Sequence, residues 1–340
     1  MAIVLIPKIP SADRPEQFRP ISSNIDKIAA KILVGRLRGL LSQLISPEQG
    51  AFVPGRSISH QCLIAQEAVN KLRVSTTKEG FLAVKVDIEQ TYDRMSWHTL
   101  RQVLSLLGFP SCYAEWLLQC VQAPKYTLVI NGRRSDWIMG ERGFRQECSL
   151  SPYLFTLCSE LLSATIHEQG TTMGFPISIG GPHLSHLLYA DDILILLRET
   201  DDAVRSCSRV LADYCSWTRK CINMPKSMLM TSKAMSCWKG DWVAHLLGFR
   251  RVVELDYLGV WLAMRKLNKF DFANTLMQWQ IKIWQWGNRH LSLAGRATLV
   301  RYSFLAGLPY WLTHSEITRA VVDTVERVAR AFLWQKGPSC

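Results

Sequence analysis

The stretch LSHLLYADDILILL, residues 184–197, places two adjacent carboxylates, Asp191 and Asp192, between two apolar runs. Apolar runs of this kind indicate buried β-strands, in which Asp is rare. Two explanations stay open from this stretch alone. Asp favours turns, so the pair could mark only the tip of a β-hairpin. Alternatively, the two carboxylates belong to a site, and the rest of the sequence has to distinguish these explanations.

A second apolar stretch, FLAVKVDI at residues 81–88, follows Gly80 and carries Asp87 near its carboxyl end. Its length and composition predict a buried strand. If this strand and the 184–197 hairpin share one sheet, three carboxylates converge at the sheet edge. Several carboxylates in one place become favourable around divalent cations, which prefer oxygen ligands. Two Mg²⁺ ions held by aspartates are an arrangement used for in-line phosphoryl transfer.

The elements around these strands are predicted from periodicity and turn residues. Helical spacing of apolar residues runs over about 24–44, with Ile28 and Ile32 in the apolar set, and further helices are expected over 95–107 and 201–217. Asn131-Gly132 predicts a hairpin turn, and Ser151 is the expected N-cap of a helix that runs to Gly170. The middle of the chain therefore reads as a small mixed sheet backed by helices, with mostly helical ends.

The composition narrows the function classes only partly. The chain has 340 residues, 48% hydrophobic composition and a formal net charge of +12. A basic balance fits a polyanionic partner such as nucleic acid, although it also fits a protein without one. Ten cysteines without any C-x-x-C argue against a zinc ribbon or finger. No signal peptide and no run of 18 apolar residues is found, so we expect a nuclear or cytoplasmic protein without membrane contact.

An ordered set of motifs carries a family resemblance. YADD, VDIEQTYD and RGFRQECSLSPYLF occur together with LIPKIP…FRPIS, QGAFVPGR, YLGV and LSLAGRATLV. In this order and spacing, the sequence resembles the reverse transcriptases of non-LTR (LINE-type) retrotransposons, especially those of plants. The resemblance covers nearly the whole chain. It implies an α+β fold of right-hand polymerase form: partial fingers over 1–80, a palm with a small antiparallel sheet over 81–262, and a helical thumb or connection over 263–340.

The resemblance also implies roles for individual residues. Asp87, Asp191 and Asp192 match the catalytic, metal-binding aspartates, which would hold two Mg²⁺ ions, with Mn²⁺ as an alternative. Tyr92 matches the aromatic residue beneath the incoming sugar that excludes a 2′-hydroxyl. Gln146 matches a glutamine near the nucleotide and the templating base. The structural alternatives are a core tyrosine for Tyr92 and a solvated loop glutamine for Gln146.

Cations in three loops match further nucleotide-binding positions. Arg19 and Lys8 correspond to triphosphate contacts, and guanidinium groups suit phosphate because they donate paired hydrogen bonds. Lys226 matches a lysine that protonates the leaving pyrophosphate. Each of these is otherwise an ordinary surface cation. His183 and His186 form an H-x-x-H before the aspartates, but they lie on an expected strand where the family commonly has histidine without metal, which disfavours a metal site.

The sequence departs from the family pattern in two ways. Gln146 is usually followed by glycine, whereas here Glu147 follows and adds a negative charge near the triphosphate site. At intermediate dielectric this costs on the order of a few kcal/mol, so we expect weakened polymerisation that Glu147→Gly would raise in a primer-extension assay. The match also starts abruptly at IVLIPK and ends at AFLWQKGPSC, which suggests a truncated copy of a longer element.

The sequence therefore predicts an RNA-directed DNA polymerase that transfers deoxynucleotides to a primer 3′-hydroxyl by two-metal chemistry. Its expected partners are an RNA template, a DNA primer and dNTP, and protein partners stay unknown. The alternative is a catalytically decayed, nucleic-acid-binding remnant of the same element. A metal-dependent nuclease is a weaker option, because it leaves RGFRQ and LSPYLF without a role.

Overall fold

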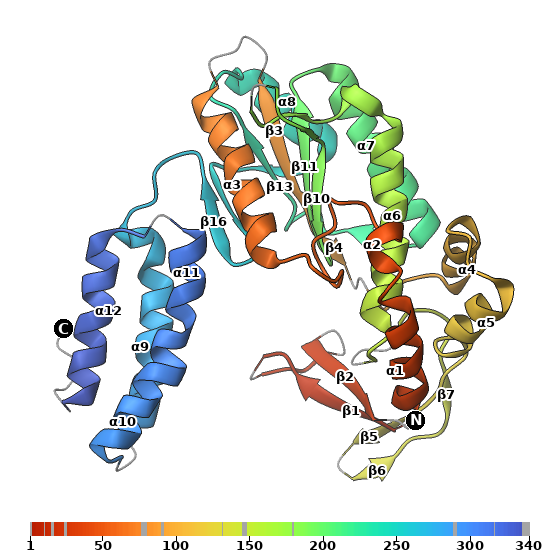
Figure 1. Cartoon of the computed structure of the whole chain (residues 1–340), viewed down its shortest axis with the longest axis horizontal. Helices are drawn as coiled ribbons and strands as arrows, with labels where there is room; N and C mark the ends of the chain where they lie inside the picture. The colour runs from red at the N-terminus through yellow and green to blue at the C-terminus, as the bar shows by residue number, and fades with distance from the viewer. Residues whose placement is uncertain are drawn as a thin grey trace. The chain divides into compact units, whose positions relative to one another are not determined.

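The computed structural model describes residues 2–9, 11–14, 17–23, 26–75, 80–89, 92–130, 132–144, 148–178, 180–287, 291–315 and 317–334. The chain divides into two compact units (Figure 1). The first unit contains residues 1–61 and 74–252, and the second contains 62–73 and 253–340. The three-part division into fingers, palm and thumb stays a prediction. Among the helices that the structure describes, none is both long and apolar enough to cross a membrane.

The first unit is built on a five-stranded sheet of order β10-β11-β3-β13-β14. The strands are β10 (His186–Tyr189), β11 (Asp192–Arg198), β3 (Phe81–Val86), β13 (Met228–Thr231) and β14 (Arg250–Arg251). All neighbours are antiparallel except the parallel pair β13 and β14. The expectation that the 81–88 strand and the 184–197 hairpin share one sheet is therefore confirmed.

Three helices supply apolar side chains to this sheet: α6 (Ser151–Glu168), α7 (Asp201–Thr218) and α8 (Cys237–Leu247). Helices α6 and α7 run side by side (Figure 1). Sheet residues such as Val84 and Ile195 are fully buried together with Leu162 of α6 and Tyr214 of α7. This core makes the sheet a rigid support for the residues at its ends.

A second apolar cluster of the first unit joins α6 to α1 (Asp26–Leu37), α2 (Leu41–Leu44), α4 (Trp97–Leu106) and α5 (Ser111–Gln119). The expected apolar face of the first helix was partly wrong. Ile28 and Ile32 are 66% and 57% exposed, whereas Ala30, Leu33 and Leu37 are buried. The helix ends at Leu37, and its buried row of Ala30, Leu33 and Leu37 belongs to the apolar cluster shared with α4, α5 and α6, whereas Ile28 and Ile32 lie outside it.

A second sheet pairs β1 (Ala2–Pro7) with β2 (Phe18–Ser23) antiparallel and with β5 (Lys125–Ile130) parallel. Strand β5 also pairs with β6 (Arg133–Arg134) and β7 (Ile138–Met139). The expected hairpin is confirmed, because Ile130 pairs with Arg133 and Gly132 has φ of 78°. Two short antiparallel pairs complete the unit: β4 (Ile88–Glu89) with β12 (Cys221–Ile222), and β8 (Phe175–Pro176) with β9 (His183–Leu184).

The N-cap expected for α6 was wrong by one residue. Ser151 is the first helical residue, Pro152 is the second, and Leu150 occupies the cap without a side-chain hydrogen bond. A turn closed by the hydrogen bond from Ser151 N to Cys148 O precedes the helix. The N–H groups of Tyr153 and Leu154, which a Ser151 cap would have served, both donate to the Leu150 carbonyl at 3.1 Å, so the Ser151 hydroxyl is not needed as a cap.

The second unit contains residues 62–73 of α3 (Ile58–Val74), the hairpin β15 (Glu254–Tyr257)–β16 (Val260–Ala263) and four further helices. These are α9 (Ala273–Gly287), α10 (Leu293–Leu299), α11 (Leu308–His314) and α12 (Arg319–Leu333). Ile283, Phe304, Val325 and Phe332 form their common core. The unit therefore has an apolar cluster of its own.

Candidate active site

The two adjacent aspartates lie at the tip of the β10–β11 hairpin. Tyr189 pairs with Asp192, which leaves Ala190 and Asp191 as the two loop residues. Ala190 has φ of 55°, and a positive φ at the first loop residue alone is the pattern of a type II′ turn, where glycine is usual. An alanine in this conformation costs about 1–3 kcal/mol, so neighbouring groups have to hold the turn.

Asp87 lies at the same end of the sheet as the hairpin tip. The β11–β3 register, continued by one residue, places Asp192 opposite Asp87. The Asp87 N–H donates to Ser227 Oγ at 3.1 Å, and the Asp87 carbonyl accepts from Asn223 N–H at 2.8 Å. Ser227 Oγ in turn donates to the Asn223 carbonyl at 2.9 Å. The turn over 223–227 therefore fixes the backbone that carries Asp87.

The three aspartates have different surroundings. Asp191 is exposed, whereas Asp87 and Asp192 are half-buried, and Lys85 Nζ lies 3.5 Å from Asp192 Oδ1. Within the described ranges, the one set of three Asp, Glu, His or Cys side chains with ligand atoms mutually within 4.8 Å lies elsewhere. The aspartates thus share one sheet end without converging to that distance. Three carboxylates in this position are hard oxygen donors, which fit Mg²⁺ or Mn²⁺.

Tyr92 follows β4 and stacks on Phe155 of α6. The ring centroids are 5.2 Å apart and the ring planes are inclined by 29°. Burial, reinforced by the nearby Asp191 carboxylate, raises the pKa of Tyr92 to about 12. Tyr92 therefore stays protonated at neutral pH, and its ring is held in one orientation beside the aspartates. This geometry is compatible both with a tyrosine that only packs in the core and with one that lies beneath the sugar and excludes a 2′-hydroxyl.

The RGF segment lies against the backbone around Tyr92. Phe144 N–H donates to the Tyr92 carbonyl at 2.7 Å, and Gly143 N–H donates to the Met95 carbonyl at 2.9 Å. Gly143 has φ of 87°, and a Cβ there would lie 2.5 Å from the Asp93 carbonyl oxygen. Only glycine allows this close approach. The segment that leads into Gln146 is therefore anchored beside Tyr92.

Lys220 is buried behind the Tyr92–Phe155 pair. Its ammonium donates to the Tyr214 hydroxyl at 3.0 Å and lies 4.1 Å from the centroid of the Phe155 ring. The side chain is 2% exposed, and burial lowers the pKa of Lys220 to about 7. A cation over an aromatic face is attracted by the ring. Lys220 thus supports, from the core side, the ring on which Tyr92 stacks.

Gln49, between α2 and α3, reaches the hairpin tip. Its side-chain oxygen accepts from Ala190 N–H at 3.2 Å and from Ala51 N–H at 2.9 Å. Its amide donates to Ser159 Oγ of α6 at 3.2 Å. The residue is fully buried. Through Gln49, the loop over 45–57 is thus joined both to the turn that carries Asp191 and to helix α6.

The structure describes only some of the other residues that are expected to contact the nucleotide. Lys226 is exposed in the 223–227 turn, next to the serine that holds Asp87. Arg19 lies on β2 opposite Ile6, and Lys8 is exposed just after β1. The Arg19 side chain lies outside the described residues, as do Gln146 and Glu147. Their nucleotide-binding roles therefore stay predictions.

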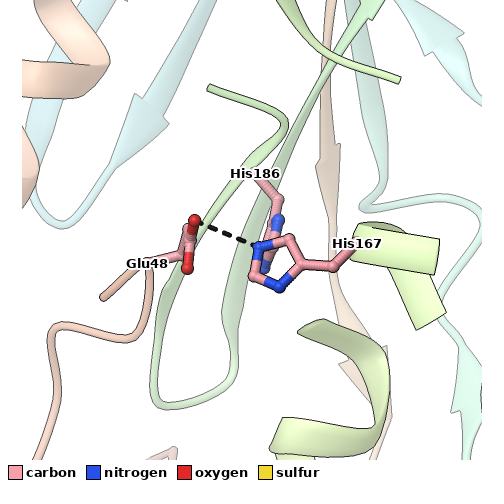
Figure 2. A group of neighbouring side chains, drawn as sticks. All are labelled: Glu48, His167 and His186. Carbon is pink, nitrogen blue, oxygen red and sulfur yellow. Dashed lines mark hydrogen bonds and ion pairs between the residues drawn. The ribbon is translucent and has the colours of Figure 1, made fainter. Parts of the chain in front are cut away.

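Glu48, His167 and His186 form a separate cluster (Figure 2). Glu48 Oε1 lies 3.2 Å from His167 Nε2. His186 is fully buried, with its ring nitrogens 2.9 Å from Ser185 Oγ and 3.0 Å from Ser163 Oγ. Burial lowers the pKa of His186 to about 3, with a smaller contribution from His167. Since both ring nitrogens already bond serine hydroxyls, we interpret His186 as a core histidine.

Sequence reasoning did not single out Gln49, Ser227, Phe155 or Lys220. Ser227 follows Lys226 in the NMPKS motif, so a hydroxyl next to a proposed active-site lysine was the available signal. Gln49 lies in QGAFVPGR, where a polar residue precedes a glycine in a loop. Lys220 follows helix α7 and belongs to no apolar run, so the local sequence does not predict that it is buried. Each contact depends on pairing between segments far apart in the chain, which local patterns do not encode.

Comparison with known proteins adds family information to this geometry. The model of the family "Reverse transcriptase (RNA-dependent DNA polymerase)" matches residues 6–262. The Transposon TX1 uncharacterized 149 kDa protein of Xenopus laevis is 24% identical, over 97% of this chain and 25% of that protein. The Pol polyprotein from the type-2 retrotransposable element R2DM of Drosophila melanogaster is 26% identical, over 76% of this chain and 24% of that protein. The chain thus spans about a quarter of the length of these relatives.

A solved structure supports the fold. Apo telomerase from Candida tropicalis, truncated from its C-terminal domain, superposes with a TM-score of 0.50 at 12% identity, covering 77% of this chain and 53% of that one. The expected α+β right-hand polymerase fold is confirmed, whereas the plant subtype stays a prediction. From the family match and the non-LTR retrotransposon relatives, the chain belongs to the reverse transcriptase (RNA-dependent DNA polymerase) family.

Proposed function

We propose that the chain is the RNA-directed DNA polymerase domain of a non-LTR retrotransposon. The observation that carries this proposal is the meeting of Asp87 and the Asp191–Asp192 pair at one end of the central sheet. Ser227 holds the backbone of Asp87, and Gln49 holds the backbone of Ala190, the residue before Asp191. Such pre-organisation is what a catalytic carboxylate set requires.

Asp87, Asp191 and Asp192 are the residues that would hold two Mg²⁺ ions, or Mn²⁺ in their place. When bound, these ions would stabilise charge on the attacking and leaving oxygens of the phosphoryl transfer. The exposed Asp191 is open to solvent and substrate, whereas Asp192 is tied to Lys85 at 3.5 Å. We therefore assign the main ligand roles to Asp87 and Asp191.

The nucleotide is positioned by groups around these carboxylates. The ring of Tyr92, held against Phe155, would lie beneath the sugar and exclude a 2′-hydroxyl, and its fixed orientation supports this role. Gln146 would contact the base pair, Arg19 the triphosphate, and Lys226 would donate a proton to the leaving pyrophosphate. The anchoring of Gly143 and Phe144 beside Tyr92 supports the placement of Gln146 next to the same substrate.

The proposed partners are an RNA template, a DNA primer and dNTP. In the second unit, Trp279 and Trp284 contact Phe304 and Phe332 in the core, while Lys282 and Arg301 are exposed. Aromatic side chains inside and cations outside suit a helical bundle that contacts nucleic-acid backbone. Such contacts are sequence-independent and weaken with salt.

The alternative function is a catalytically silent nucleic-acid-binding remnant. One observation in the sequence favours it: Glu147 stands where the family usually has glycine. Its negative charge near the triphosphate would weaken catalysis without removing the fold or the positive charge of the chain. This alternative retains template and primer binding.

A primer-extension assay with an RNA template, a DNA primer, dNTP and Mg²⁺ separates the two functions. We expect extension by the wild type, loss of at least about 100-fold in Asp191→Ala because a metal ligand is removed, and unchanged template–primer binding. The matched control is Asp202→Ala, which removes an exposed carboxylate in the first turn of α7. Binding without extension in every variant would establish the remnant, and absence of binding would contradict both functions.

A further inference from the structure

The loop over 45–57 is paired to the proposed catalytic hairpin by its backbone. Gln49 forms a parallel bridge with Leu188 of β10. Leu188 N–H donates to the Glu48 carbonyl at 2.9 Å, and Gly50 N–H donates to the Leu188 carbonyl at 2.7 Å. The loop thus acts as a one-residue extra strand beside β10, next to the turn at Ala190 and Asp191.

Two features fix this loop in place. The Arg56 guanidinium donates to the carbonyls of Ser46, Gln49 at 2.6 Å and Ile45 at 2.8 Å. Gly50 packs so closely on Gln61 that a Cβ there would lie 2.3 Å from its side chain. The loop is therefore anchored independently of the hairpin, and can serve as a reference against which the hairpin tip is held.

The Gln49 side chain is the polar group by which this loop reaches the tip. Its oxygen accepts the N–H of Ala190, and Ser159 holds the other end of the same carboxamide. Ala190 has the positive φ that a residue with a Cβ adopts only where its surroundings impose it. Asp191 is the next residue in the chain. A change in the backbone angles of Ala190 would therefore change the direction of the Asp191 carboxylate.

We propose that Gln49 is a positioning residue, which holds the Ala190–Asp191 turn so that the Asp191 and Asp192 carboxylates present one geometry to a divalent cation. The inference rests on the proposed polymerase function for its consequence. Partners that orient metal ligands commonly change metal affinity by about 10- to 100-fold when removed.

The test uses the full chain with Mn²⁺ as the probe, and free Mn²⁺ is measured by electron paramagnetic resonance without nucleotide. Wild type and Asp191→Ala define the site. Gln49→Met keeps the side-chain length but has no acceptor, and should weaken Asp191-dependent Mn²⁺ binding by about 10-fold. Gln61→Met is the matched control. Gln61 is also buried and donates to the same loop at Glu48 O, 3.1 Å away, but within the described part of the chain its side chain makes no hydrogen bond to the turn.

A second readout is amide hydrogen exchange at Ala190 in the metal-free protein. We expect faster exchange at Ala190 in Gln49→Met and not in Gln61→Met. Unchanged affinity and exchange in Gln49→Met, or equal losses in both variants, would overturn the inference, since the second result is what a general structural role predicts. If Gln49→Met does not fold, Ser159→Ala replaces it, because it frees the carboxamide and should shift both readouts in the same direction.

The two readouts separate this inference from the proposed function. If the wild type shows no Asp191-dependent Mn²⁺ binding, the proposed polymerase function fails, and the positioning role is judged on Ala190 exchange alone. If the wild type binds Mn²⁺ and Gln49→Met binds it equally well, the function stands and the positioning role is wrong.

Discussion

At the scale of single residues, the burial of the Lys220 ammonium group lowers the stability of the first unit. An ammonium group loses its hydration on burial, and Lys220 regains one hydrogen bond to Tyr214 and cation–π contacts with the rings of Phe155 and Tyr214. Burial is the main cause of its lowered pKa, and the fully buried Cys158, the half-buried Cys215 and the Asp191 carboxylate partly oppose this shift. The side chain therefore supports the Tyr92–Phe155 pair at a cost in stability.

Lys220→Met should raise the free energy of unfolding by roughly a few kcal/mol at pH 6 and by less at pH 9, since each pKa unit corresponds to about 1.4 kcal/mol. The native pKa is about 7 and the ordinary value is 10.5. Between these values only the unfolded chain binds the proton, so wild-type stability rises with pH, and below pH 7 the full cost is present. Urea unfolding at both pH values measures this. Lys233→Met, at an exposed lysine, is the control, and a gain that does not depend on pH would contradict the account.

At the scale of elements, the sheet and the hairpin were predictable because their signals are local. Alternating and continuous apolar runs identified the strands over 81–88 and 184–197, and Asn131-Gly132 identified its turn. The buried face of α1 was not predictable, because its partners α4 and α6 come from later in the chain. The role of Gln49 was not predictable for the same reason, because the Ala190 amide that donates to it is 141 positions away. Of the site, sequence motifs located the aspartates but not the groups that hold them.

The β10–β11 turn gives a prediction of its own. Ala190→Val should lower the free energy of unfolding by about 1–3 kcal/mol, because a β-branched residue is strongly disfavoured at positive φ. Ala190→Gly, which tolerates this backbone, should stay within about 1 kcal/mol of the wild type. Chemical denaturation of the three proteins measures the difference. Equal stability of the valine and glycine variants would mean that the turn is not held in the left-handed conformation.

At the scale of the whole molecule, the chain carries separate apolar cores. The first unit is packed around the central sheet and α6, and the second around Ile283, Phe304 and Phe332. The proposed catalytic residues Asp87, Asp191 and Tyr92 all belong to the first unit. Damage to one core is therefore expected to stay local, because proteins open in cooperative units and each unit here has an apolar core of its own.

Phe332→Ala tests this independence. Phe332 is 1% exposed and its ring lies 5.8 Å from that of Trp284, so truncation should cost about 3–5 kcal/mol. Hydrogen exchange should rise over α9, α10 and α12 and stay unchanged in β3 and β11. Leu162→Ala, in the core of the first unit, should give the reverse pattern. A uniform rise across both units in either variant would show that the chain unfolds as one body.

The order of strands in the central sheet has a consequence for folding. Strand β3 is synthesised early, but Val86 finds its partner Ile193 only after more than a hundred further residues have been made. The partner strand on its other edge, β13, is synthesised later still. During synthesis this strand of almost continuous apolar residues has both edges unpaired, which exposes it to aggregation. Closing such long loops is slow, so the carboxylate site is completed late on the folding pathway.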